Sequence, residues 1–179
     1  DKKLIDDLCR RWDANDYDPK LDTFKASIDT RLFDAKINNP SGFDKPRLVI
    51  FSEAIDTVDS ISRVLENRGY NVLKITAANR EAMQSVIKEN FDANSDTQKD
   101  DYNVIVTTEV LAEGVNLHRA NVILNYDAPW NATRLMQRIG RVNRIGSKEA
   151  FVHVFNFFPS TEGNEQIHLE QIAYAKLQA

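Results

Sequence analysis

Short apolar runs that alternate with segments of helical spacing constrain the fold of this chain more than any other feature. Residues 47–52 are rich in branched and aromatic side chains, which is typical of a strand buried on both faces. Residues 72–76, 103–107, 121–125 and 151–157 predict four further strands. Strands that alternate with helices predict a parallel sheet with helices on both faces and with ligand-binding groups at the carboxyl ends of the strands.

Apolar residues at helical spacing predict the segments that cover this sheet. The predicted helices span residues 4–12, 20–37, 54–68, 79–91, 131–139 and 164–177. Asp18-Pro19 is a start signal for the second helix, Gly69 a stop for the third, and Asn131 an N-cap for the fifth. In the third helix we expect Ile55 on the buried side together with Val58, Ile61 and Leu65. The polar and acidic residues 92–101 predict an exposed loop.

Composition predicts one globular domain. A chain of 179 residues removes roughly 70% of its unfolded surface from water, and 42% apolar with 28% charged residues is ordinary for a soluble protein. No apolar run approaches the roughly 20 residues that cross a bilayer, and no signal peptide opens the chain, so we expect an intracellular protein. The single Cys9 excludes an internal disulfide, and three scattered histidines do not suggest a metal site.

The chain begins at Asp1 without a methionine and ends at Ala179 within the last predicted helix, which suggests a piece of a longer polypeptide. Its net charge is −4, so any contact with nucleic acid must come from a local patch and not from the field of the whole molecule. Residues 134–148 form that basic patch.

Four arginines in this patch are the main candidates for binding an anion. Arg138, Arg141 and Arg144 lie three residues apart, and Arg134 lies one turn earlier. On a helix they share a face and repel one another unless an anion binds, and the guanidinium fork matches phosphate oxygens. The alternative is a solvated face paired with the chain's own carboxylates. Gly140 favours a ligand, because glycine costs roughly 1 kcal/mol in a helix interior and needs a reason such as close backbone approach to a ligand or a neighbouring strand.

A second candidate segment follows the predicted strand 103–107. Thr108 and Gly114 lie where ligands collect in a parallel sheet, and they can approach phosphate through a side-chain hydroxyl and a backbone N–H. Taken alone, a helix N-cap at Thr108 and a C-cap at Gly114 explain the same residues better.

Together the two segments closely resemble motifs V and VI of superfamily 2 helicases and translocases. The matching residues, in order, are Thr108, Gly114, Asn116, Gln137, Gly140, Arg141 and Arg144. Residues 47–52 resemble motif IV, and residues 125–131 resemble the segment between motifs V and VI in the chromatin-remodeller-like translocases and their bacterial relatives. The resemblance covers about residues 18–175, with Asp18-Pro19-Lys20-Leu21 as the entry to the domain. It implies a linker or helical segment over 1–17 and a helicase C-terminal domain over 18–179.

This resemblance implies an α/β fold, a RecA-like three-layer sandwich with a mostly parallel central sheet and helices on both faces. It also implies the second of two motor domains in an ATP-driven DNA helicase or translocase. Arg141 and Arg144 would be arginine fingers that reach the phosphates of ATP held by the N-terminal RecA-like domain of the same polypeptide, a role worth about 10³ to 10⁵ in turnover. Gln137 and Gly140 would lie at that nucleotide site.

Further residue roles follow from the resemblance. Gly114 and Asn116 would lie near the ribose and phosphates, although many relatives carry aspartate where this chain has Asn116, and an amide contributes no charge. Thr108 and Ser52 would contact the nucleic-acid backbone, which fixes register without reading sequence. A hydroxyl that ends a buried strand explains Ser52 equally well.

Three other side chains have two interpretations each. Arg138 matches a motif position, and a structural salt bridge explains it equally well. Trp130 and Tyr126 can stack on a base, although anchoring the adjacent loop in the core is the more frequent role of such aromatics. The sequence of residues 125–146 resembles that of the remodeller-like translocases. By analogy with them, we expect double-stranded DNA as the partner and a bacterial, cytoplasmic protein.

The sequence lacks a Gly-x-x-x-x-Gly-Lys-Ser/Thr phosphate loop and an acidic Mg²⁺-binding box after an apolar strand. In the resembling family both belong to the first motor domain, so ATP and Mg²⁺ would be bound mainly there, and we expect this chain alone not to hydrolyse ATP. A non-catalytic nucleic-acid- or protein-binding module derived from a helicase domain is the alternative. A Rossmann-type mononucleotide enzyme is a third hypothesis. The absence of a Gly-x-Gly-x-x-Gly motif after the first strand argues against it.

Overall fold

The structure, a computed structural model, describes residues 2–15, 17–34, 47–129, 131–143 and 151–158. In chain order its elements are α1 (Lys2–Asp13), α2 (Pro19–Ser27), the π-helix η1 (Ile28–Leu32), β1 (Leu48–Phe51), α4 (Ile55–Glu66), β2 (Val72–Ile75), α5 (Gln84–Phe91), β3 (Val104–Thr107), the 3-10 helix η2 (Glu109–Leu111), β4 (Val122–Asn125), α6 (Ala132–Val142) and β5 (His153–Asn156). The predicted closing helix, 164–177, and the end of the second, beyond residue 34, lie outside the described residues.

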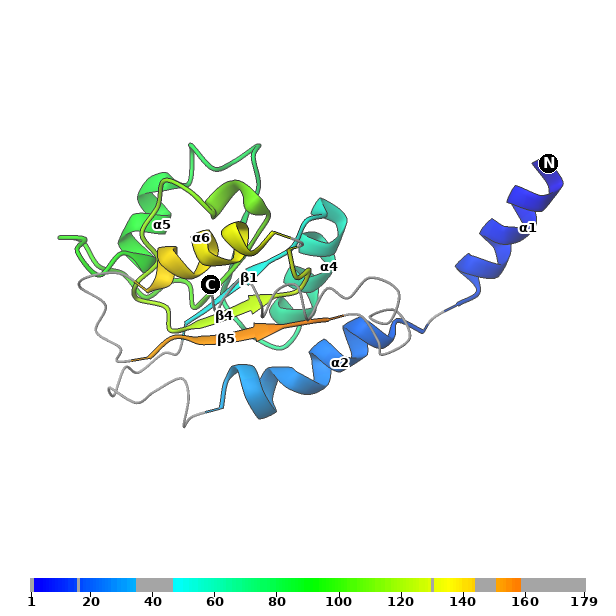
Figure 1. Cartoon of the computed structure of the whole chain (residues 1–179), viewed down its shortest axis with the longest axis horizontal. Coiled ribbons are helices and arrows are strands. Elements are labelled where there is room, and N and C mark those ends of the chain that lie inside the picture. Colours follow the sequence, from blue (N-terminus) through cyan, green and yellow to red (C-terminus); the bar gives the residue numbers. More distant parts are fainter. Residues whose placement is uncertain (1, 16, 35–46, 130, 144–150, 159–179) are drawn as a thin grey trace.

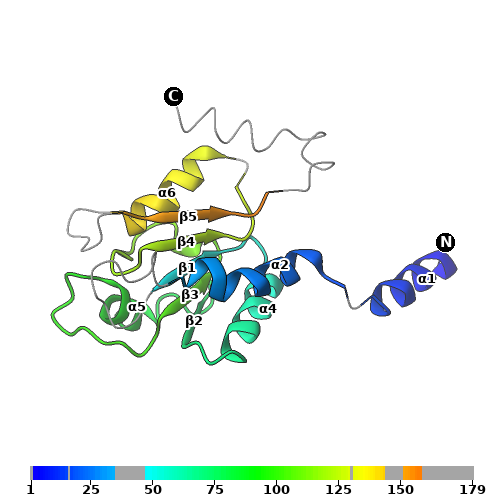
Figure 2. The same ribbon diagram turned by 90° about the horizontal axis from the view of Figure 1, so that it is seen from below.

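The five predicted strands are confirmed and form one parallel sheet. Their order is β2-β3-β1-β4-β5, with β1 in the centre (Figure 2). Phe51, the last residue of β1, pairs in register with Thr107 of β3 and with Asn125 of β4. The carboxyl ends of the three central strands therefore meet at the same edge of the sheet, and the loops that follow them lie next to one another.

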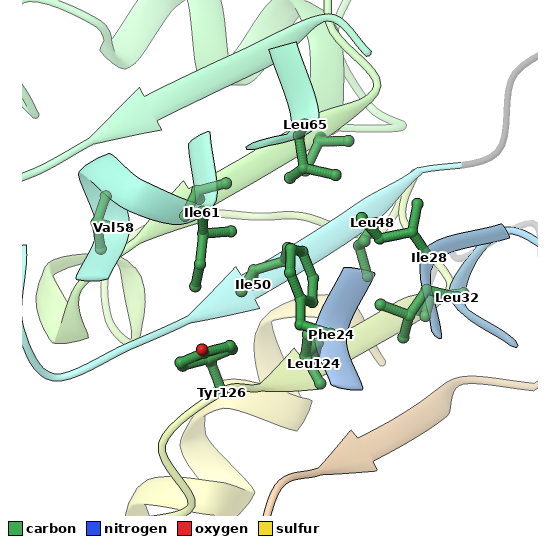
Figure 3. Packing of buried hydrophobic residues seen from close by; sticks show 13 residues of the cluster. Phe24, Ile28, Leu32, Leu48, Ile50, Val58, Ile61, Leu65, Leu124 and Tyr126 are labelled. Carbon is green, nitrogen blue, oxygen red and sulfur yellow. The ribbon is translucent and has the colours of Figure 1, made fainter. Parts of the chain in front are cut away.

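Alternate side chains of the central strands divide the core into two layers. On β1, Leu48 and Ile50 pack under α2, η1 and α4, whereas Val49 and Phe51 pack under α5, η2 and α6. Figure 3 shows the first layer, in which side chains of α2 and α4 gather over β1 and β4, and Figure 1 shows α5 and α6 on the side of the strands opposite α2. This confirms the predicted α/β arrangement with helices on both faces.

The connections between strands explain this division of the helices. The connection from β1 to β2 crosses the sheet in one direction and contains α4, whereas the connections from β2 onward cross in the opposite direction and contain α5, η2 and α6. Connections between parallel strands are almost always right-handed, so a reversal of direction must also change the face. The sheet order therefore puts α5, η2 and α6 together on one face.

Two predicted helix starts are confirmed by their caps. The Asp18 carboxylate accepts a hydrogen bond from the backbone N–H of Leu21 at 2.9 Å, with Pro19 at the first helical position. The Asn131 side chain accepts from the N–H of Thr133 at 2.9 Å and starts α6. Each cap satisfies an N–H that has no partner within the helix, which explains why α2 and α6 begin where they do.

Other boundaries differ from the prediction. Helix α5 begins at Gln84 and not at residue 79, because the Asn79 side chain accepts from the N–H of Thr76 and donates to the carbonyl of Lys74, which holds a turn there. Helix α6 continues to Val142, three residues beyond its predicted end. Ile55 was wrongly expected on the buried side, since 57% of it is exposed at the first turn of α4.

Helix α1 lies apart from the sheet, at the N-terminal end of the domain (Figure 1). Its large apolar residues are all exposed, namely Leu4, Ile5, Leu8 and Trp12. Within the described ranges, neither this helix nor any other is long and apolar enough to span a membrane.

Replacing Phe24 by Ala tests which apolar residues hold the fold. Phe24 is fully buried and meets the ring of Tyr126 edge to face at 5.9 Å, so the cavity left behind should lower the free energy of unfolding by about 3–5 kcal/mol. Trp12→Ala is the control, because a side chain that is 77% exposed should change stability by no more than about 0.5 kcal/mol. Urea denaturation of the three proteins measures both effects, and equal losses would contradict the described core.

Candidate functional site

The carboxyl edge of the sheet brings together residues that follow three neighbouring strands. Ser52 follows β1, Thr108 follows β3, and Asp127 lies two residues beyond β4. The Ser52 side chain is buried, and its hydroxyl donates to Oδ2 of Asp127 at 2.6 Å. This hydroxyl is thus engaged within the domain, in agreement with the second interpretation of Ser52 as the end of a buried strand.

Asp127 accepts hydrogen bonds from three residues at this edge, and it was not among the site residues expected from the sequence. Its Oδ1 accepts from Nζ of Lys20 at 2.6 Å, and its Oδ2 also accepts from the N–H of Glu53 at 3.0 Å. Burial raises the pKa of Asp127, but the hydrogen bonds from Lys20, Ser52 and Glu53 and the charge of Lys20 outweigh burial and hold the pKa below its ordinary value. A carboxylate just past a buried strand was the signal that could have identified it.

Thr108 lies at the start of η2 with an extended backbone, φ −85° and ψ −172°. Thr108 thus occupies the N-cap position of η2, as one of its two interpretations predicted, but its side chain makes no capping hydrogen bond. Its carbonyl accepts from the hydroxyl of Thr107 at 3.0 Å. Thr108 is half-buried and directly follows the residue of β3 that pairs with Phe51, and its hydroxyl has no hydrogen-bond partner in the part of the chain that the structure describes.

Gly114 has a backbone conformation that explains its identity. Its φ is +78°, a left-handed backbone value that residues other than glycine rarely adopt. A Cβ atom at this position would also lie 2.6 Å from Nη2 of Arg80, which donates to the carbonyl of Glu113 at 2.9 Å. Since η2 ends at Leu111, Gly114 belongs to the loop beyond it and is not the predicted helix C-cap.

A cavity of about 340 Å³ brings three of the predicted site residues together. Its lining comprises Gln84, Ile87, Lys88, Asp92, Gly114, Val115, Asn116 and Arg141. Gly114 and Asn116 come from the loop after η2, Arg141 from the last turn of α6, and the remaining polar residues from α5 and its end. A second cavity of about 410 Å³ contains Arg80 and shares Gln84, Ile87 and Val115 with the first.

Arg141 is attached to the loop after η2 at two points. Its Nε donates to the carbonyl of Ala112 at 2.9 Å, and its own carbonyl accepts from the N–H of Leu117 at 2.8 Å. These bonds orient the guanidinium at the cavity, and its terminal Nη atoms have no acceptor among the described residues. Arg144, the second predicted finger, lies outside the described residues.

Arg138 has a different position from Arg141, one helical turn away. It is fully buried, forms an ion pair with Glu109, and donates from Nη1 to Oδ1 of Asn125 at 2.7 Å and to the carbonyl of Asp127 at 3.1 Å. Its guanidinium carbon lies 5.0 Å from the centre of the Phe51 ring. Burial lowers the pKa of Arg138 to about 10, so the group remains charged at neutral pH.

The expectation that the arginines of α6 share one face that awaits an external anion is therefore wrong for Arg138. Its anion is Glu109 of the same domain, and the salt-bridge interpretation of Arg138 is confirmed. Arg134 is exposed, and only Arg141 of the described arginines on α6 lines the cavity.

Gln137 and Gly140 lie on the half-buried side of α6. The Gln137 amide donates to a carboxylate oxygen of Glu113 at the long distance of 3.4 Å, so Gln137 contacts the same loop as Arg141. A Cβ atom added to Gly140 would meet nothing within 4 Å. No described neighbour therefore accounts for a glycine in this helix, and the close approach to a neighbouring strand that was one predicted reason for it is not found.

Tyr126 belongs to the core. Only 4% of it is exposed, and its ring meets Phe24 at 5.9 Å and Phe157 at 5.4 Å edge to face. Burial raises the pKa of Tyr126 to about 12, so its hydroxyl stays protonated. Trp130 lies outside the described residues. Asp92 and Ser95 are buried as well, so the predicted loop 92–101 is exposed only in part.

Metal-binding groups are not assembled in the described ranges, where no set of three or more His, Cys, Asp or Glu side chains is arranged to hold an ion. The cavity at Arg141 contains one carboxylate, Asp92, together with the cations Lys88 and Arg141. The donor set therefore fits an anionic organic ligand and does not fit a resident divalent cation.

Comparison with known proteins identifies relatives of this domain. The chain is similar to the uncharacterized ATP-dependent helicase YqhH of Bacillus subtilis, with 30% identity over 131 residues, 73% of this chain and 22% of the relative. It is 26% identical over 123 residues to Protein CHROMATIN REMODELING 5 of Arabidopsis thaliana, 69% of this chain and 7% of the relative. It is 29% identical over 123 residues to the ATP-dependent RNA helicase eIF4A of Mycosarcoma maydis, 69% of this chain and 28% of the relative. The chain thus spans less than a third of the length of each of these three relatives.

Solved structures show the same fold. The C-terminal part of the Fun30 ATPase domain matches with a TM-score of 0.66 and 22% identity, over 89% of this chain and 47% of that one. The Hef helicase domain of Pyrococcus furiosus matches with a TM-score of 0.57 and 21% identity, over 95% of this chain and 32% of that one. Both likenesses confirm the predicted RecA-like α/β architecture.

The profile of the helicase conserved C-terminal domain family matches residues 35–146, which include the loop after η2, helix α6 and the cavity between them. This match covers more than half of the chain, and the chain therefore belongs to the helicase conserved C-terminal domain family.

Proposed function

We propose that this domain is the second motor domain of an ATP-dependent DNA helicase or translocase and that it acts on ATP bound by an N-terminal RecA-like domain. The cavity at Arg141 is the observation that carries the proposal. Its guanidinium is held through Nε and the backbone, while its terminal donors have no partner among the described residues. Such a group is preorganised for phosphate oxygens that come from outside the domain.

Arg141 acts on the transferring phosphoryl group as an arginine finger, and Arg144 acts with it. A finger stabilises charge that develops on the phosphate oxygens, and it is effective only when it is already oriented, because reorientation during the reaction would cost free energy. The attachment of Arg141 to Ala112 and Leu117 supports this role. Gln137, which contacts Glu113 of the same loop, contributes to the site with Gly114 and Asn116.

The partner domain supplies what this chain lacks. Mg²⁺, when bound with the nucleotide, neutralises charge on the phosphates. The phosphate lysine and the acidic residues for that ion belong to the partner in this proposal, and the sequence of this chain contains no phosphate loop. ATP binding closes the two domains on each other, and hydrolysis reopens them, which moves the nucleic acid.

Nucleic acid runs along the carboxyl edge of the sheet. The Thr108 hydroxyl has no partner among the described residues, and α4 begins at the same edge with Ala54 at its N-cap, which supplies no side-chain acceptor. Free N–H groups at a helix start and a hydroxyl are suitable donors to backbone phosphates. The Ser52 hydroxyl can contact the nucleic-acid backbone only if its hydrogen bond to Asp127 breaks. The likeness of residues 125–146 to remodeller-like translocases supports double-stranded DNA as the track.

Replacing Arg141 or Arg144 by Ala in the full-length protein tests the finger role. ATP turnover with DNA should fall by about 10³-fold or more, because charge on the phosphoryl group is no longer stabilised, while DNA affinity should stay within about twofold. Arg134→Ala is the matched control, since Arg134 is exposed on the same helix and does not line the cavity. Normal turnover in both Arg141→Ala and Arg144→Ala would refute the role.

The isolated chain and the full-length protein should differ in activity. We expect DNA-stimulated ATP hydrolysis only in the full-length protein, because the phosphate loop is absent from these 179 residues. A phosphate-release assay with double-stranded DNA, and with RNA in a parallel series, measures this. Equal turnover by the isolated chain would exclude an ATP site shared by two domains. Stimulation by RNA alone would show that the protein acts on RNA and not on double-stranded DNA. A full-length protein that binds nucleic acid but hydrolyses no ATP would favour the non-catalytic alternative.

Gly140→Ala separates a structural from a functional reason for this glycine. Since an added Cβ atom meets nothing within 4 Å, alanine should stabilise the isolated domain by up to about 1 kcal/mol through its helix propensity. In the full-length protein we expect lower ATP turnover, because the nucleotide or the partner domain approaches the backbone at this position. Met136→Ala, at an exposed position of the same helix, is the control. Full turnover in Gly140→Ala would show that nothing approaches there.

A further inference from the structure

The Asp92 carboxylate lies in the wall of the cavity that contains Arg141, although it belongs to a segment that the sequence analysis treated as an exposed loop. Asp92 follows the end of α5 and is only 7% exposed. Its Oδ2 accepts a hydrogen bond from the side-chain amide of Asn116 at 3.1 Å. The sheet thus brings a buried carboxylate next to a predicted nucleotide-binding residue that lies 24 positions away in the sequence.

The chemistry of the cavity wall restricts the ligand. Arg141 and Lys88 contribute positive charge, and Asp92 contributes negative charge in the same cavity of about 340 Å³. An ionised carboxylate repels phosphate, so a purely anionic ligand does not fit the whole wall. A molecule with phosphates at one end and neutral hydroxyl donors at the other fits both parts, and a ribonucleoside triphosphate has this composition.

Asp92 retains capacity to accept such hydroxyls. An ionised carboxylate offers about four lone-pair sites. Its Oδ1 accepts from the N–H of Asn94 at 2.9 Å and faces Nε2 of His118 at 3.5 Å, while Oδ2 accepts from Asn116. These contacts hold the carboxylate in place, so little rotational freedom would be lost when it accepts a hydroxyl from a ligand.

We propose that Asp92 binds the ribose hydroxyls of the nucleotide and that Asn116 is the positioning residue that orients its carboxylate. This inference rests on the proposed function, because the triphosphate is the one that Arg141 acts upon. It adds an acidic ribose-binding residue from the end of α5, outside the two segments that the arginine and glycine motifs occupy.

A comparison of ATP with 2′,3′-dideoxy-ATP in the full-length protein tests the proposal. In the wild type the KM for the dideoxy nucleotide should be about tenfold higher than for ATP, because hydrogen bonds to a charged acceptor are lost. In Asp92→Asn the KM for ATP should rise about tenfold and the KM for the dideoxy nucleotide should stay within about twofold, so the discrimination disappears. The change falls on KM, whereas loss of a structural element would lower kcat for both nucleotides.

Two further variants make the result decisive. Asp96→Asn is the matched control, because it removes the same charge from an exposed position of the same loop and should keep the wild-type discrimination. Asn116→Ala removes the amide partner of Asp92 and should lower the discrimination at least threefold. If Asp92→Asn does not fold, Asp92→Ala takes its place, because it removes the same charged acceptor and should abolish the discrimination in the same way. Thermal denaturation identifies variants that fail to fold.

The proposal is overturned if the wild type does not distinguish the two nucleotides, if the folded variants of Asp92 and Asn116 keep the wild-type discrimination, or if Asp96→Asn loses it as well. Failure of the proposed function has a different signature. In that case the wild type hydrolyses neither nucleotide, or Arg141→Ala retains full turnover, whatever the discrimination between ATP and its dideoxy analogue.

Discussion

The ion pair between the fully buried Arg138 and the partly buried Glu109 is the interaction on which the candidate site depends. Arg138 is fully buried, and its guanidinium also bonds to Asn125 and Asp127 and lies over Phe51. These partners belong to the loops and ends of three neighbouring strands, so one side chain fixes α6 against the carboxyl edge of the sheet. Removal of Glu109 would leave the charge of the buried Arg138 without its carboxylate partner, which makes the position of α6 sensitive to this pair.

A fixed α6 determines where Arg141 lies. Arg141 is three residues beyond Arg138, and its contacts with Ala112 and Leu117 attach the last turn of α6 to the loop after η2. The same loop carries Gly114 and Asn116, so the cavity forms where these two chain segments meet. Arg138 is therefore neutralised within the domain by Glu109. Arg141 is held at the cavity, and its terminal Nη atoms have no acceptor among the described residues.

The sequence predicted most of the architecture and part of the site. The five strands and the capping residues Asp18 and Asn131 were predicted, because periodicity and cap chemistry are local properties. That Gly114, Asn116 and Arg141 lie at one cavity was implied by the resemblance to the helicase motifs. The start of α5 was not predicted, since the turn held by Asn79 competes with the helix. The distinct positions of Arg138 and Arg141 were not predicted either, because helical spacing places both on nearly the same face and does not say which one meets a carboxylate.

Local pattern alone determined that the chain forms a parallel sheet with helices on both faces and that hydroxyls, glycines and arginines lie near its carboxyl edge. Only tertiary structure decided which polar groups neutralise one another. Asp127 joins Lys20 with Ser52, Glu109 joins Arg138, and Asp92 joins Asn116, across separations of 24 to 107 positions along the chain. Such pairs depend on the order of strands in the sheet, which brings distant loops together. The sequence around a carboxylate in a polar loop does not indicate which residue that carboxylate will contact in the folded domain.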